Sequence, residues 1–82
     1  MEGKTLSFLE KLRQQMMLPF ELTLDTDLTE YASYDSLTKM TMVALTDEVF
    51  GMEVSPDRVG AVFRNVRTVR ELFDELGIAY DQ

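Results

Sequence analysis

The chain contains no cysteine, no histidine and no tryptophan among its 82 residues. Without cysteine it can form neither disulfides nor thiolate metal sites, a usage that suits a reducing cytosol. Without histidine or cysteine it cannot supply a Ser-His-Asp triad, a Cys-His pair or the common zinc ligand sets. We therefore expect no metal site and no self-contained nucleophilic catalysis, so the sequence does not predict an enzyme.

Long apolar runs are also absent. The stretch Met16-Met17-Leu18-Pro19-Phe20 is far too short to span a bilayer, and the N-terminus does not lead into a signal-type hydrophobic region. Basic residues are scarce, because 8 lysines and arginines stand against 15 acidic residues, for a formal net charge of −7. This charge repels nucleic-acid phosphates and anionic lipid surfaces. We expect a cytoplasmic monomer with no nucleic-acid partner and no membrane insertion.

The length predicts a single domain over residues 1–82, near the lower size at which a chain folds alone. Its charge is polarised along the sequence. Nine acidic residues and one basic residue, Lys39, lie in residues 21–57, whereas four arginines lie in residues 58–70. One interpretation is a pair of solvated faces; the other is an acidic middle that docks on basic partner surfaces.

Apolar residues recur at helical spacing in four segments. The first runs from about Thr5 to Met17 and is expected to end because of Pro19, which disfavours helical geometry in the residue before it. No period persists over residues 19–34, where polar turn residues predict a long loop. The second helix is expected to open at Asp35 or Ser36, either of which can act as N-cap, and to end near Gly51. Much of its predicted apolar face is defined by Leu37, Met40, Ala44 and Leu45, with Met42, Val49 and Phe50 on the flanks.

Two further helices follow. Ser55 and Pro56 indicate a helix start, with serine as the cap and proline at the first position. Thr68 and Glu71 predict a capping box at the start of the last helix, and Gly77 predicts its end. No strand is required, so the predicted fold is all-α, a small four-helix bundle with a long loop between helices 1 and 2. The apolar stripes of the two helices are Val59, Val62, Phe63 and Val66, then Val69, Leu72, Phe73 and Leu76.

The triplet Asp35-Ser36-Leu37 opens the second helix, where Ser36 alone is readily interpreted as a helix N-cap. Its setting is more informative, because the chain is short, acidic and helical and the triplet follows a long first loop. The segments "FGMEVSPDRV" and "TVRELFDELG" strengthen the pattern. With these motifs, the chain resembles the acyl carrier protein family over nearly all of its length.

The resemblance implies a function for the triplet. It implies that Ser36, flanked by Asp35 and Leu37, carries a covalent 4′-phosphopantetheine arm whose terminal thiol holds acyl groups as thioesters. The protein would then act as substrate and shuttle in fatty acid, lipid or secondary-metabolite biosynthesis. Its implied partners are a phosphopantetheinyl transferase and acyl-loading or acyl-transferring enzymes with basic docking surfaces.

An acyl chain on such an arm is expected to find partial shelter between the second and third helices. Methionine is flexible and fills irregular space, which suits a core that must open. Plain core packing remains the alternative interpretation for each residue. The residues predicted to lie beside the acyl slot are Met40, Met42, Val43, Val62 and Phe63.

The chain departs from the family pattern on its second helix, where Lys39 and two threonines occupy turns that are acidic in well-studied fatty-acid carriers. Ser33 stands where a glycine is usual, and Thr46 where a core leucine is common. These departures indicate a specialised carrier with its own partners. The chain length, with no flanking linker, favours a freestanding carrier over a module of a larger synthase. The residues predicted to recognise those partners are Thr38, Lys39, Thr41, Asp47 and Glu48.

Other functions remain open from the sequence. An aminoacyl or peptidyl carrier would share the same motif, and a helical interaction module would use the acidic middle without a prosthetic group. A calcium-binding loop that begins at Asp25 and includes Asp27 is a weaker alternative. Glu30 stands where such a loop needs glycine, and Ser36 stands where it needs a bidentate glutamate. The sequence identifies neither the cargo nor the pathway.

Overall fold

The computed structural model describes residues 3–80, which form four α-helices, one short 3₁₀ helix and no strand. The prediction of an all-helical chain with four helices is confirmed for these residues. The elements are α1 (Gly3–Met16), η1 (Leu28–Glu30), α2 (Ser36–Phe50), α3 (Pro56–Phe63) and α4 (Val69–Leu76).

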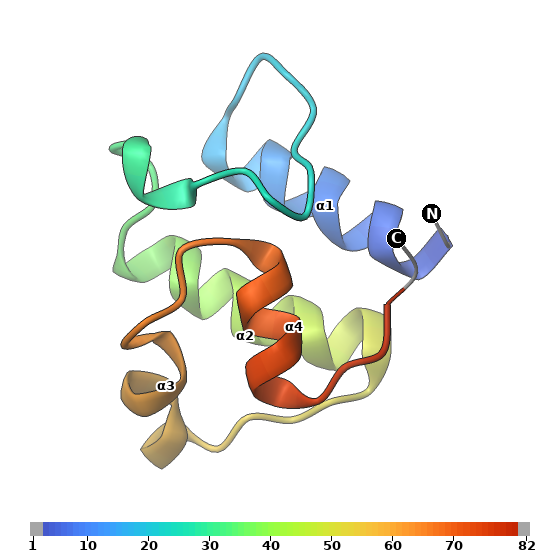
Figure 1. The fold of residues 1–82 in the computed structure, drawn as a ribbon, viewed down its shortest axis with the longest axis vertical. Helices are drawn as coiled ribbons and strands as arrows, with labels where there is room; N and C mark the ends of the chain where they lie inside the picture. Colours follow the sequence, from blue (N-terminus) through green and yellow to red (C-terminus); the bar gives the residue numbers. More distant parts are fainter. Residues whose placement is uncertain (1–2, 81–82) are drawn as a thin grey trace.

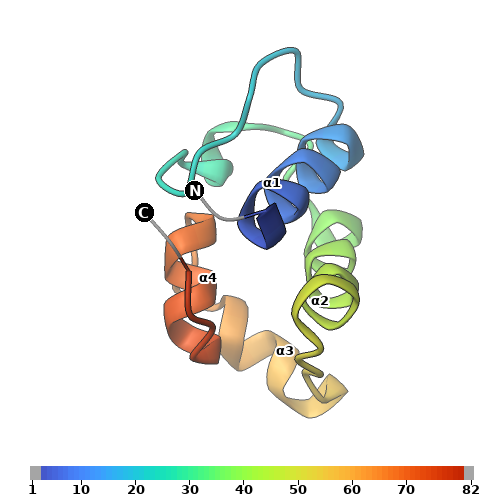
Figure 2. The ribbon, with the colours of Figure 1, turned by 90° about the vertical axis from the view of Figure 1, so that its right-hand side faces the viewer.

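The helices are arranged around one interior. α1 packs along α2, and α4 lies across from this pair (Figures 1 and 2). α3 contacts α4 and lies at one end of the molecule, while the segment that connects α1 to α2 covers the opposite end (Figure 2). The N-terminus of α2 thus faces the space between this connecting segment and α3 (Figure 1).

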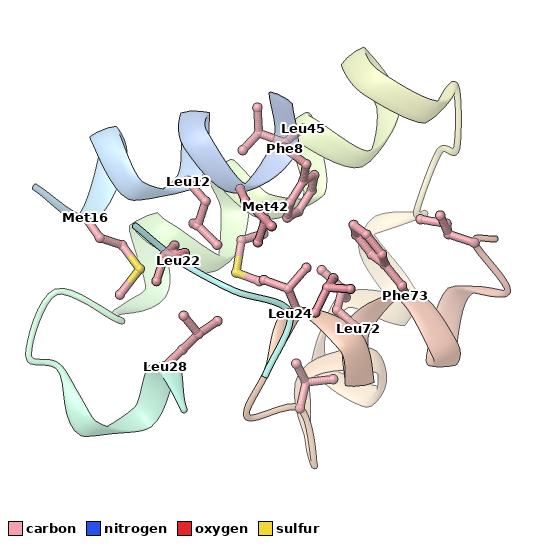
Figure 3. Packing of buried hydrophobic residues seen from close by; sticks show 14 of the residues in the cluster. Phe8, Leu12, Met16, Leu22, Leu24, Leu28, Met42, Leu45, Leu72 and Phe73 are labelled. Atoms are coloured by element: carbon pink, nitrogen blue, oxygen red, sulfur yellow. The ribbon is translucent and has the colours of Figure 1, made fainter. Parts of the chain in front are cut away.

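The core joins all four α-helices and the connecting segment. Figure 3 shows apolar side chains of α1, α2, α4 and the connecting segment pointing toward one another. Its centre is an aromatic cluster, because the rings of Phe8 and Phe50 lie edge-on to Phe73 at centroid distances of 5.0 and 5.1 Å. Such edge-to-face pairs add about 0.5–1.5 kcal/mol to the stabilisation from buried area. One ring from each of α1, α2 and α4 therefore fixes the relative positions of these helices.

α1 ends differently from the prediction. Met17 adopts a left-handed conformation with φ 57°, and its amide donates to the Gln14 carbonyl at 3.1 Å. The Leu18 amide donates to the Arg13 carbonyl at 3.2 Å, which completes a Schellman motif. The helix therefore stops at Met16 because of this motif. Pro19, which was expected to end the helix, disfavours helical geometry only at Leu18, two residues later.

The segment of residues 17–35 is more structured than the sequence indicated. Leu22, Leu24 and Leu28 are buried in the core, and Asp27 caps η1 by accepting a 3.0 Å hydrogen bond from the Thr29 amide. The spacing of Leu22 and Leu24 was the available signal, because alternate residues of an extended segment face the same side. The prediction of residues 19–34 as a patternless loop missed both features.

The buried face of α2 is rotated relative to the prediction. Leu37 and Met40 are 66% and 55% exposed, and Ala44 is exposed as well, so only Leu45 of the predicted face is buried. Buried threonines take their place because their hydroxyl groups are hydrogen-bonded to the backbone. The residues of α2 that are buried are Thr38, Met42, Leu45 and Thr46.

The last two helices begin where the sequence predicted. α3 has Ser55 as its cap residue but ends at Phe63, so Val66 is buried from the link to α4 rather than from the helix. In α4 the Thr68 and Glu71 capping box is present, and Gly77 ends the helix with φ 72°. The predicted signals for α4 are confirmed.

Candidate functional site

At the N-terminus of α2, Asp35 and Ser36 have different roles. Asp35 is the N-cap, and its Oδ1 accepts a 2.9 Å hydrogen bond from the Thr38 amide. This hydrogen bond is the main reason that the pKa of the Asp35 carboxyl lies below its ordinary value. Ser36 is the first helical residue, so the prediction that either residue could cap is resolved in favour of Asp35.

The Ser36 side chain is exposed. Among residues 3–80, no group forms a hydrogen bond with its hydroxyl, whereas the neighbouring Asp35 carboxylate is engaged with the helix. The Ser36 hydroxyl is therefore accessible and has no structural role that a modification would disrupt. It also lies at the positive end of a helix of 15 residues, where an attached anion is stabilised.

A groove of about 470 Å³ begins at Ser36 and runs between α2 and α3. Its apolar wall includes Met40 and Phe63, two of the residues predicted to line an acyl slot. At Gly60 the groove has no side chain, and an added Cβ there would meet nothing within 4 Å. The residues that line this groove are Ser36, Lys39, Met40, Val59, Gly60, Phe63 and Arg64.

The other predicted slot residues lie elsewhere. Met42 and Val62 are buried in the central core, and Val43 is half-buried against it. None of the three lines the groove beside Ser36. Val59, Gly60 and Arg64 were not predicted as groove residues. The helix-start signal at Ser55 and Pro56 predicted the helix that contains Val59 and Gly60 but not which of its faces is turned toward α2.

The predicted partner-recognition residues have different environments. Thr38 is only 2% exposed, and its hydroxyl donates to the Ser33 carbonyl at 2.6 Å, so it is not on the surface that a partner can touch. Lys39 places its Nζ 5.2 Å from the centroid of the Tyr34 ring. The remaining three lie farther along α2: Thr41 is half-buried, Asp47 is exposed, and Glu48 is exposed and forms a 3.0 Å ion pair with Lys11.

Part of the acidic middle is neutralised within the molecule. Asp25 forms an ion pair with Arg70, and Asp27 forms one with Arg67, each at 2.7 Å. The hydrogen bond from Arg67 is the main reason that the pKa of Asp27 falls to about 2. Residues 3–80 contain no group of three or more carboxylates that could hold a metal ion. The carboxylates considered for a calcium loop are thus engaged with two different arginines.

Comparisons with protein-family models, with curated proteins and with solved structures found no match. None of the helices in the part of the chain that the structure describes is long and apolar enough to cross a membrane. The function is therefore inferred from the sequence motif and from the geometry around Ser36.

Proposed function

We propose that this protein is an acyl carrier protein that bears a 4′-phosphopantetheine arm on the Ser36 hydroxyl. The observation that carries the proposal is the position of Ser36: its exposed hydroxyl lies at the first residue of α2, at the mouth of a groove. In this proposal the four helices form a bundle of the acyl carrier type, and the segment of residues 17–35 is its long first loop.

The residues around Ser36 fit such a group. Because Asp35 caps α2, esterification of Ser36 removes no hydrogen bond that holds the helix. The first turn of α2 offers the positive end of a helix dipole to the attached phosphate. When bound, the arm supplies a thiol that holds an acyl group as an electrophilic thioester, a chemistry that this cysteine-free chain lacks.

The chain itself supplies position, contact surface and shelter. Leu37 and Met40 present exposed apolar side chains on the first turns of α2, next to the attachment site, and are available to partner enzymes. Met40, Val59 and Phe63 offer an apolar wall to the cargo. This assignment replaces the wider predicted slot, because Met42 and Val62 are buried in the core and do not line the groove.

Intact-protein mass spectrometry tests the proposal. The chain is produced together with a phosphopantetheinyl transferase, and we expect its mass to increase by one phosphopantetheinyl group. Ser36→Ala abolishes the increase, while its helical circular dichroism signal remains that of the parent protein. Ser55→Ala is the matched control, because Ser55 is an exposed serine that precedes another helix and its side chain makes no capping hydrogen bond.

Two results would contradict the proposal. An unmodified parent protein would show that Ser36 is not an attachment site and would favour a helical interaction module. A mass increase that persists in Ser36→Ala would place the modification on another residue.

A further inference from the structure

A second cavity of about 440 Å³ adjoins the groove at Ser36. The two cavities share Lys39, Phe63 and Arg64, and together they form what we call the basic groove. Although the chain has 15 acidic residues, no carboxylate among residues 3–80 lines either cavity. The second cavity is lined by Thr29, Lys39, Phe63, Arg64, Asn65, Val66 and Arg67.

The cations of the basic groove are largely free. Four of the 8 basic residues form ion pairs in the described part of the chain, namely Lys11, Arg13, Arg67 and Arg70. Lys39 and Arg64 form none there. Two basic side chains without ion pairs among residues 3–80 therefore line the groove, and no carboxylate lines it with them, in a protein whose formal net charge is −7.

The negative charge of Asp35, beside Ser36, gives Lys39 and Arg64 an electrostatic role. Asp35 directly precedes Ser36 and accepts the capping hydrogen bond, which favours its ionised form. A phosphate on Ser36 would add negative charge next to this carboxylate, and the two charges repel each other. Lys39 and Arg64 offset that repulsion from the groove side.

We propose that the basic groove binds the phosphate of the group carried at Ser36, through Lys39 and Arg64. The identity of the ligand rests on the proposed function. A phosphate fits better than a carboxylate on a partner enzyme, because the groove begins at the hydroxyl that would be esterified. The apolar side chains of Met40 and Val59 can accompany the aliphatic part of the same ligand.

The affinity of the basic groove for a free ligand is weak. Contacts between exposed charges are individually small, so we expect a Kd of the order of millimolar for an untethered phosphate compound. Attachment to Ser36 turns the contact into an intramolecular one with a millimolar or higher effective concentration. The tethered phosphate therefore occupies the groove for a substantial fraction of the time.

The test uses unmodified protein and two probes, free 4′-phosphopantetheine and pantetheine, which lacks the phosphate. In two-dimensional ¹H–¹⁵N NMR titrations, we expect 4′-phosphopantetheine to shift the backbone amides of Lys39, Arg64 and Asn65. Lys39→Gln combined with Arg64→Gln weakens this binding about tenfold. Arg58→Gln is the matched control. Arg58 is an exposed arginine of α3 that has no ion pair among residues 3–80 and lines neither cavity.

Three outcomes would overturn the inference: no amide shifts, equal shifts with pantetheine, or unchanged binding in the double variant. Unchanged NMR spectra away from the groove verify that the variants are folded. The titration requires no covalent attachment, so it is independent of the mass measurement on Ser36. A chain that is never modified contradicts the carrier function, while the titration still decides whether the groove binds phosphate.

Discussion

At the scale of single residues, buried threonines decide which side of α2 faces the core. Thr46 is fully buried, and its hydroxyl lies 2.7 Å from the Val43 carbonyl and 3.2 Å from the Met52 carbonyl. Thr5 on α1 is also fully buried, but its hydroxyl has no hydrogen-bond partner among residues 3–80. A buried hydroxyl that lacks a partner is costly, whereas a satisfied one is not.

This contrast predicts opposite effects of one substitution. Thr5→Val removes an unsatisfied hydroxyl and is expected to raise the free energy of unfolding by about 1 kcal/mol. Thr46→Val removes a satisfied hydroxyl and is expected to lower it by about 1 kcal/mol. Urea unfolding followed by circular dichroism measures both. Equal losses of stability in the two variants would show that the Thr5 hydroxyl is satisfied in solution.

At the scale of elements, helix ends show how local rules operate in this chain. α1 and α4 both end in Schellman motifs, but the left-handed residue is Met17 in α1 and Gly77 in α4. A side chain in this conformation brings its Cβ close to the backbone at a cost of about 1–2 kcal/mol, which glycine does not incur. The end of α1 is therefore strained, and Met17 gains little from packing because its side chain is exposed.

We predict that Met17→Gly stabilises the protein. The relief of left-handed strain exceeds the greater chain entropy of glycine in the unfolded state, and the expected net gain is about 0.5–1 kcal/mol. Gly77→Ala is the converse control and is expected to cost about 1 kcal/mol, since nothing but the backbone conformation opposes the added Cβ. Thermal unfolding measures both effects. A loss of stability in Met17→Gly would mean that the Met17 side chain makes contacts in solution that outweigh the strain.

At the scale of the whole molecule, the connecting segment is attached to the start of α4. The Leu28 amide donates to the Arg67 carbonyl at 2.8 Å, and the Arg70 amide donates to the Leu24 carbonyl at 3.0 Å. The ion pairs of Asp25 with Arg70 and of Asp27 with Arg67 reinforce the same attachment. The polarised charge of the sequence thus serves in part to join segments that are distant in the chain.

We predict that Asp25→Asn combined with Asp27→Asn loosens this attachment. Hydrogen exchange at neutral pH is expected to accelerate about threefold at the Leu28 and Arg70 amides, while core amides of α2 are unaffected. Glu10→Gln is the matched control, because it removes the Glu10–Arg13 ion pair within α1 and leaves the segment attached. Unchanged exchange at both amides in the double variant would show that the backbone hydrogen bonds suffice.

The same double variant also changes the response to acid. The pKa of Asp27 is about 2 in the folded protein, against 3.8 ordinarily, and that of Asp25 is lowered by its hydrogen bonds from Arg70. As the pH falls, these two carboxylates take up protons in the unfolded chain before they do so in the folded protein. The stability that the ionised carboxylates contribute is therefore complete above about pH 4 and is lost toward pH 2. We expect the melting temperature of the double variant to fall less steeply over this interval. Glu10→Gln is expected to make the melting temperature fall less steeply over the same pH interval, since the pKa of Glu10 is also about 2. It is not expected to change the hydrogen exchange of the Leu28 amide.

The resemblance to acyl carrier proteins depends on short motifs, of which the triplet Asp35-Ser36-Leu37 marks Ser36 as the predicted attachment residue. In the structure, Asp35 caps α2, and the Ser36 hydroxyl forms no hydrogen bond within residues 3–80. Helix capping and the exposure of a hydroxyl group thus belong to two different residues. The sequence alone could not separate these roles, since aspartate and serine are both good N-caps.

The sequence by itself determined the number of α-helices in residues 3–80 and the start of each of the last three, because caps act on amides within one turn of the same chain. It also determined the end of α4 through Gly77. Only the tertiary structure decided that Thr38 and Thr46 face the core while Leu37 and Met40 face solvent, because hydroxyl groups satisfied by the backbone can be buried in place of apolar side chains. The tertiary structure likewise brought Lys39 and Arg64 to one groove beside Ser36, since the position of α3 relative to α2 depends on contacts between residues far apart in the chain.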